Sequence, residues 1–431
     1  MSISVRSPEL LRVMGRRDLT AAVINSVIGA GIFALPSAVA AFTGAWSPAA
    51  VLLAGLGILP IAFCVAEVGS RFDVAGGPYL YTREAFGSTL GFHVGWLLVW
   101  ARLLAVGAVL NVLTAYLATL APWVGTPTGR AITMTMAVTL FTAINVRGVR
   151  QAAWTVNLFT VAKLLPLLLV IVLGLVYLSR DVLATQQVAE ARWNDAVLAM
   201  VFAFGGFDVA LIAAGEVRRP REDTAFAISV GMLIVTAVYA LTQLAVIGVL
   251  PHAAASKAPI ADALRATLGP GGAVLGSVAA AVSAYGWLTG NALLLPRLPL
   301  SMAERGELPQ LFGRVHQAFR TPHISILACS LVALAMGLAG SFAATATLSA
   351  TGRLVVYVLM CGALLVLRRR GHPPAGFVLP AGKVLAIVGI VFSAWLLSTR
   401  SFAQAWIIGA VIGSGVLVQW IMRRRATASP P

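Results

Sequence analysis

The stretch Val27-Ile-Gly-Ala-Gly-Ile-Phe33 lies at the midpoint of a hydrophobic segment, Leu19 to Phe42, that is long enough to cross a membrane. A second segment, Ala196 to Ala214, carries Gly205-Gly206 at its own midpoint. Glycine disfavours a helix by about 1 kcal/mol and lets the backbone approach a ligand closely. Irregular backbone persists at the centre of a bilayer only where it is buried in protein or lines a cavity. These paired interruptions predict the substrate site of a secondary transporter, in which two broken helices meet.

The composition is that of an integral membrane protein. Of the 431 residues, 59% are hydrophobic and 11% are charged. The apolar stretches predict an all-α protein with twelve membrane spans. These spans are expected at roughly 18–43, 47–70, 90–120, 131–147, 152–178, 194–216, 225–250, 272–300, 322–340, 343–367, 378–398 and 401–422. The three cysteines lie within spans, and the five histidines lie in loops or at span edges. We therefore expect no disulfide scaffold, no metal site and no cofactor.

The distribution of positive charge predicts the orientation. The chain has a net charge of +16, and 22 of its 31 Lys and Arg residues lie in the loops on the side of the N-terminus, against 6 in the opposite loops. The positive-inside rule then places both termini in the cytoplasm of a multi-pass cell-membrane protein, with a bacterial inner membrane as the expected location. Basic loops against an anionic leaflet also account for the charge without a nucleic acid partner. The basic stretch Met1 to Arg17 does not have the form of a cleavable signal sequence.

The whole chain, 1–431, is expected to form a single transmembrane transporter domain. Five spans in each half would form two repeats inserted in opposite directions, repeat one over about 18–178 and repeat two over about 194–367. Each repeat would begin with a broken helix. The extra helices at about 378–422 fall outside the repeats, and the outer loop Ala254 to Leu268 reads as a short amphipathic helix.

The two breaks have the chemistry to bind a zwitterion. An unwound segment at Gly29-Ala30-Gly31 exposes amide N–H groups at the start of the next half-helix, where an anion such as a carboxylate is favoured. The carbonyls freed at Val27, Phe202 and Gly205 suit an ammonium group. An α-amino acid carries both charges a few ångströms apart. The alternative is that the glycines only permit close helix packing.

Charged residues within spans are the candidates for energy coupling. Lys163 lies about 12 residues, or roughly 18 Å, into a core about 30 Å thick. A charge there costs at least roughly 2.5 to 3.5 kcal/mol, so it needs a partner or a function. Asp208 lies at a similar depth and is either a proton carrier or a counter-ion to Lys163, Arg102 or Arg353. Glu67, near an inner span end, is expected to cap a helix or to pair with loop residues.

Several motifs resemble those of the amino acid permeases of the amino acid-polyamine-organocation superfamily, in order and over nearly the whole chain. They are Val27-Ile-Gly-Ala-Gly-Ile-Phe33, Arg71-Phe-Asp-Val-Ala-Gly-Gly-Pro-Tyr79 with Arg83-Glu-Ala-Phe-Gly87, Phe202-Ala-Phe-Gly-Gly-Phe-Asp208 with Glu216-Val-Arg-Arg-Pro220, and Pro296-Arg297 with Ala303-Glu-Arg-Gly-Glu-Leu-Pro309. The resemblance implies a leucine-transporter-like fold, with five-plus-five inverted repeats, broken helices 1 and 6, and alternating access around a central site.

The resemblance also implies roles for the residues at the first and second breaks. The Ala30 and Gly31 amides would bind the substrate carboxylate, and the carbonyls of Val27, Phe202 and Gly205 would bind the amine. The Phe202 ring would act as a gate over the substrate.

Four residues outside the breaks complete the implied site. Asn291 would face the side-chain end of the pocket. The Lys163 ammonium would take the place of a sodium ion found in sodium-coupled relatives, and Asp208 would occupy an acidic coupling position. Arg353 stands at a position where many relatives have a small or polar residue. This difference puts in doubt whether the outer gate of the family is present here.

The function expected from the sequence is sodium-independent, proton-coupled uptake of neutral L-amino acids. The alternative is an exchanger or an exporter of the same fold, and the sequence does not decide between them or name the amino acid. An intramembrane enzyme would need a nucleophile and base or a metal at the midplane, and a channel would need rings of like charge. Neither pattern is visible in the sequence. The expected partners are the amino acid, protons and the lipid bilayer.

Overall fold

The computed structural model describes residues 15–72, 77–147, 153–207, 219–371 and 374–428, and the regular structure in these ranges is entirely helical. The first half contains α1 (Arg16–Val27), α2 (Gly31–Thr43), α3 (Ser47–Gly69), α4 (Gly77–Phe86), α5 (Ser88–Leu120), α6 (Pro127–Arg147), α7 (Ala153–Val176), α8 (Arg180–Ala184) and α9 (Trp193–Ala203). The second half contains α11 (Pro220–Val249), α12 (Pro259–Leu268), α13 (Pro270–Leu294), α14 (Arg297–Glu304), α15 (His323–Ala339), α16 (Phe342–Arg370), α17 (Gly382–Ser398) and α18 (Phe402–Ala428).

Eleven of the twelve ranges expected to span the membrane overlap a helix or a pair of helices, and of the range 194–216 the structure describes only 194–207, where α9 ends at Ala203. Within the described ranges, seven helical stretches are long and apolar enough to cross a membrane, and four shorter apolar helices accompany them. An all-helical membrane architecture is thus confirmed, whereas twelve crossings and the inverted repeat stay predictions. The short amphipathic helix expected within 254–268 is found as α12, which ends at Leu268 and is followed by Gly269 with a φ of +72°.

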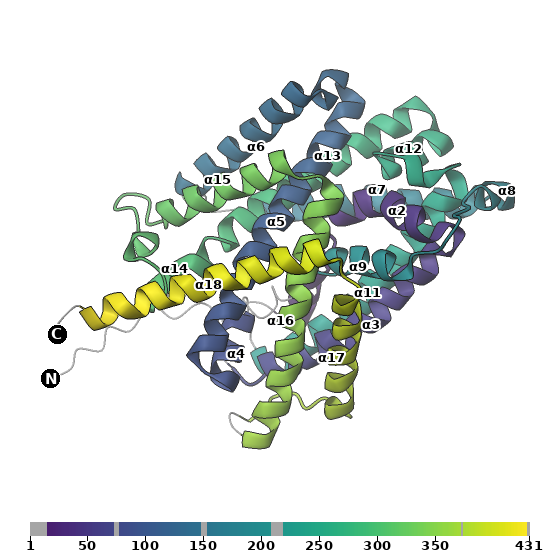
Figure 1. Ribbon diagram of the computed structural model, residues 1–431. Coiled ribbons are helices and arrows are strands. Elements are labelled where there is room, and N and C mark those ends of the chain that lie inside the picture. The colour runs from purple at the N-terminus through teal and green to yellow at the C-terminus, as the bar shows by residue number, and fades with distance from the viewer. Residues whose placement is uncertain (1–14, 73–76, 148–152, 208–218, 372–373, 429–431) are drawn as a thin grey trace.

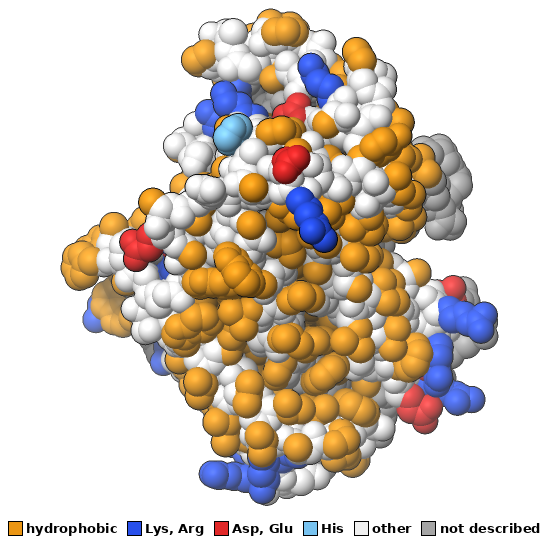
Figure 2. All heavy atoms as spheres, turned by 90° about the vertical axis from the view of Figure 1, so that its right-hand side faces the viewer, with side chains coloured by type: hydrophobic (Ala, Val, Ile, Leu, Met, Phe, Trp, Pro, Cys, Tyr) orange, Lys and Arg blue, Asp and Glu red, His pale blue; other side chains and the backbone are white. Residues whose placement is uncertain are grey.

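The core forms around α5, which runs through the middle of the molecule in Figure 1 and packs against α4, α13, α15 and α16. In its most apolar window, 67% of the α5 residues are buried inside the protein. By contrast, α18 lies along the outside, and only 6% of its window is buried. The surface in Figure 2 is mostly hydrophobic, with charged side chains in small groups toward its upper part and margins. A surface of this kind suits contact with lipid.

One buried carboxylate joins three segments at the ends of α3 and α16. Glu67 has no exposed surface, pairs with Arg71 at 2.9 Å and with Arg368, and accepts a hydrogen bond from the Leu379 amide at 2.8 Å. A buried carboxylate is stable only when its oxygens are paired in this way. The expected pairing of Glu67 with loop residues is therefore found, but in a buried position.

Candidate functional site

The first break lies between α1 and α2, where the helical hydrogen-bond pattern stops for three residues. The Ile28 amide still bonds to the Ile24 carbonyl, but the Gly29 amide bonds to the carbonyl of Val27 at 2.7 Å. The Asn25 carbonyl therefore loses the partner that a continuous helix would provide. The Ala30 amide forms no backbone hydrogen bond with any described residue. The helix restarts at Gly31, whose amide is one of the unpaired donors of a helix N-terminus.

Lys163 fills the place of the missing helical donor. Its Nζ donates to the Asn25 carbonyl at 2.9 Å, and the side chain is 4% exposed. The lysine lies on α7, so the bond connects that helix to the end of α1. The sequence placed Lys163 beside the freed carbonyls of the first break, and in this structure it contacts one of them.

The second break begins where α9 ends at Ala203. The Gly205 amide bonds to the Phe202 carbonyl at 3.2 Å, and Gly206 has a φ of +119°, a conformation that L side chains rarely adopt. The Gly206 carbonyl accepts a hydrogen bond from the Ser26 hydroxyl at 3.0 Å. A methyl group added at Gly206 would lie 2.8 Å from the Ser26 carbonyl oxygen. The two breaks thus touch each other through backbone.

A buried tyrosine on α11 binds both breaks at once. The Tyr239 hydroxyl lies 2.8 Å from the Val27 carbonyl and 3.2 Å from the Ala203 carbonyl, and the side chain has no exposed surface. The Val27 carbonyl therefore accepts two hydrogen bonds in this conformation, one from Tyr239 and one from Gly29. Sequence reasoning missed Tyr239, because a single tyrosine in an apolar helix carries no signal of what its hydroxyl contacts.

We expect Tyr239→Phe to keep the fold and to impair transport. The ring would remain buried, while two carbonyls at the breaks would lose a shared donor, at a cost of about 1 to 3 kcal/mol. Uptake in proteoliposomes should fall at least several-fold, with a modest drop in melting temperature. The matched control is Tyr177→Phe, because Tyr177 is exposed at the end of α7. Equal uptake by both variants would show that the hydroxyl has no role at the breaks.

A central cavity of about 20 Å³ lies where the breaks meet, with space for one or two water molecules. Its wall includes Val27, Gly29, Ala30, Gly31, Val109, Phe202, Ala203, Gly205, Trp287 and Arg353. Five of the six residues that the sequence assigned to substrate binding therefore line one cavity. Its small volume describes a closed conformation, with no room for an amino acid until neighbouring side chains move.

Aromatic side chains close this cavity on two sides. The Trp287 indole lies against Gly29, where an added methyl group would come within 2.8 Å of the ring. The Phe202 ring lies 3.3 Å from the methyl position of Gly31 and packs edge to face against Phe342, with ring centroids 5.9 Å apart. This position is compatible with the gating role expected for Phe202.

Two other predicted site residues lie elsewhere. Asn291 is absent from the cavity wall in this conformation, and its amide donates to the Trp287 carbonyl one turn earlier on α13 at 3.2 Å. Trp287, one turn earlier on α13, lines the cavity instead of Asn291. Asp208 lies outside the described residues.

Arg353 connects the central cavity to a second one, also about 20 Å³, which we call the inner cavity. The inner cavity is lined by Val65, Pro78, Leu98, Arg102, Phe207, Arg353, Val356, Tyr357 and Met360. Pro78 belongs to α4, which lies in the connection between two expected spans, and this connection is expected on the cytoplasmic side. The sequence associated Arg353 with the outer gate, and in the structure its side chain lines both cavities.

A family model described as "Amino acid permease" matches residues 14–422. The chain belongs to this amino acid permease family. Both helix breaks fall within the matched range, as do Lys163 and every residue that lines the central cavity.

Curated relatives of the permease are transporters. The chain is 31% identical over 424 residues to the serine/threonine exchanger of Bacillus subtilis, covering 94% of this chain and 95% of that one. It is 29% identical over 449 residues to the methylthioribose transporter of the same bacterium, covering 99% and 96%. It is also 29% identical to an uncharacterized transporter of Mycobacterium tuberculosis, covering 97% and 93%. These names support membrane transport of a small molecule rather than an enzymatic activity.

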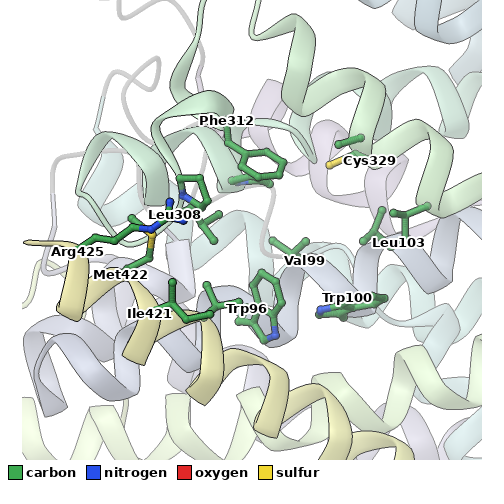
Figure 3. Close-up of a pocket in the computed structure, with 15 residues that line it drawn as sticks. Trp96, Val99, Trp100, Leu103, Leu308, Phe312, Cys329, Ile421, Met422 and Arg425 are labelled. Carbon is green, nitrogen blue, oxygen red and sulfur yellow. The ribbon is translucent and has the colours of Figure 1, made fainter.

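The permease also has a larger apolar groove away from the breaks. Figure 3 shows this groove of about 430 Å³, with Trp96 and Trp100 of α5 on one side and Ile421, Met422 and Arg425 of α18 nearby. None of the residues at the two breaks lines it. Its apolar wall offers no groups that could bind both ends of a zwitterion, so the small central cavity is the better candidate despite its size.

Proposed function

We propose that this permease carries α-amino acids across the cell membrane by alternating access at the central cavity, without sodium. The observation that carries the proposal is the bond between Lys163 Nζ and the Asn25 carbonyl, beside a break that leaves the Ala30 amide unbonded among the described residues. A fixed ammonium beside the broken helix supplies positive charge where a sodium ion would otherwise be needed. The unpaired amides at the start of α2 supply an anion site next to it.

The substrate that best fits these groups is a neutral L-amino acid. Its carboxylate would bind the amides of Ala30 and Gly31, and its ammonium would bind carbonyls of the second break. The Gly205 carbonyl accepts no hydrogen bond from the described residues, so it is available for that role. The Val27 carbonyl would become available only when Tyr239 moves away. One similar protein is named for serine/threonine exchange and another for methylthioribose transport, so substrates other than amino acids belong in the test.

Proton-coupled uptake is the transport mode that we propose, with Lys163 and Asp208 as the coupling residues. An amine in a buried site can bind and release a proton as the site opens to either side of the membrane. Exchange of one amino acid for another is the second candidate, favoured by the relative named as a serine/threonine exchanger. Export by the same fold differs only in direction.

Purified permease provides a direct test of these proposals. A thermal-shift screen would include the twenty amino acids and methylthioribose, since a ligand at 100 times its Kd stabilises the protein by about 2.7 kcal/mol. Labelled flux into proteoliposomes, with the sodium and proton gradients set independently, would follow for each ligand that binds. Saturable uptake that follows the proton gradient supports symport, and uptake that requires internal substrate supports exchange. Stabilisation by methylthioribose alone, or uptake that follows sodium, would contradict the proposal.

We further propose that both termini of this single-domain chain are cytoplasmic, on the basis of the loop charges. A cysteine at Ala255, which is exposed before α12, should react with an impermeant thiol reagent added to whole cells. A cysteine at Glu304, which is exposed at the end of α14, should react only after the cells are lysed. The three native cysteines are buried and provide little background. The opposite labelling pattern would reverse the orientation.

A further inference from the structure

The guanidinium group of Arg353 lies directly against the backbone of the second break. A methyl group added at Gly205 would overlap its Nη1 atom. Arg353 also lines the central cavity together with Ala30, Gly31 and Phe202. A positive side chain therefore faces the space in which the substrate is proposed to bind.

This guanidinium has no partner among the described residues, where it forms neither a hydrogen bond nor an ion pair. Arg71 and Arg368 differ from Arg353 in this respect, because both of them pair with the buried carboxylate of Glu67. Arg353 is half-buried, and an arginine side chain offers five N–H donors in a fixed planar arrangement. Charged residues inside a membrane protein commonly mark the substrate pathway. Because Arg353 lines the wall of the central cavity, its donors lie within reach of a ligand bound there.

We propose that Arg353 recognises the side chain of the substrate, and that the substrate class is small L-amino acids whose side chain carries an oxygen acceptor. This inference rests on the proposed function, which places the substrate carboxylate at the amides of Ala30 and Gly31. Gly31 and Arg353 line the same small cavity, so a substrate held by its carboxylate at α2 has its side chain close to the guanidinium.

The size and charge of the site define the members of this class. The Phe202 and Trp287 rings that close the cavity restrict the proposed site to short side chains. Serine, threonine and asparagine offer a hydroxyl or a carboxamide oxygen to the guanidinium. Aspartate offers a charged and therefore stronger acceptor, so we include it as a substrate in addition to the neutral amino acids proposed above. Lysine and arginine would place a second positive charge beside Arg353 and are excluded.

Pairs of amino acids with the same shape but different acceptors test the inference. Threonine and valine are one pair, and asparagine and leucine are the other. We expect the wild-type protein to bind the first member of each pair more tightly, by a factor on the order of ten, because a hydrogen bond to a charged group is lost in the second. Arg353→Leu should reduce this ratio to about one, and Arg353→Lys should restore part of it. Affinities would be measured by thermal shift and by competition for labelled uptake.

The matched control is Arg369→Leu, an exposed arginine on the same helix, which should leave both ratios unchanged. If Arg353 acted only as a structural counter-ion, its replacement would weaken both members of each pair equally and preserve the ratio. Equal binding of threonine and valine by the wild type, or a ratio that survives in Arg353→Leu, would overturn the inference and leave the proposed function intact. If no amino acid binds the wild-type protein, the proposed function itself fails.

Discussion

Lys163→Ala should abolish coupled uptake, with a loss of at least tenfold in initial rate. Lys163 Nζ is the donor that the Asn25 carbonyl accepts in place of its missing helical partner. Removing it leaves a buried carbonyl unpaired, at a cost of about 1 to 3 kcal/mol, and releases the end of α1 from α7. The rate would be measured in proteoliposomes as a function of external pH, with potassium or choline in place of sodium.

Two variants separate the charge of Lys163 from its packing. Lys163→Met fills a similar volume without a donor and should behave like Lys163→Ala. Lys163→Arg keeps a positive donor and should retain some uptake with an altered pH profile. Wild-type uptake that follows the sodium gradient, or an unchanged pH profile in Lys163→Ala, would exclude the coupling role proposed for this lysine.

Gly206→Ala should give the second large effect, a marked loss of both stability and substrate affinity. The φ of +119° at Gly206 is strained for any L side chain, at a cost of about 1 to 3 kcal/mol. The added methyl group would also lie 2.8 Å from the Ser26 carbonyl oxygen, which is backbone and cannot rotate away. The two breaks would be pushed apart, so we expect the melting temperature to fall by several degrees and substrate binding to weaken at least tenfold.

Gly290→Ala is the matched control for that substitution. Gly290 lies in α13, and a methyl group added there would meet no atom within 4 Å. Alanine also favours a helix more than glycine does, so this variant should be neutral or slightly stabilising. If Gly206→Ala melted and bound substrate like Gly290→Ala, close contact between the breaks would not be needed for function.

The sequence predicted the parts of the site that depend on local chain chemistry. Glycines at mid-span predicted the interruption after Val27, because glycine weakens a helix wherever it stands. The depth of Lys163 followed from counting residues along a helix of known rise. Its position beside the first broken helix, however, came from the family resemblance, since no spacing rule relates α7 to α1.

The parts that the sequence could not predict depend on packing between helices distant in the chain. Tyr239 is 212 residues from Val27, and nothing near either residue indicates that they meet. Trp287 and Asn291 differ by about one helical turn, so a shift of one turn along α13 decides which of them faces the cavity. Arg353 lies in α16, a helix long and apolar enough to span a membrane, but only the structure shows that it lies against Gly205.

The Tyr239 hydroxyl has a consequence for how the cycle proceeds. The hydroxyl has one proton for the carbonyls that end α1 and α9, so if these two helix ends separate, Tyr239 can stay bonded to only one of them. Separation of the two half-helices would therefore leave one of these carbonyls without its tyrosine donor, which gives the closed arrangement an energetic advantage. Under the alternating access proposed above, the Tyr239 hydroxyl would thus act as a latch that must release one half-helix before the cavity can open.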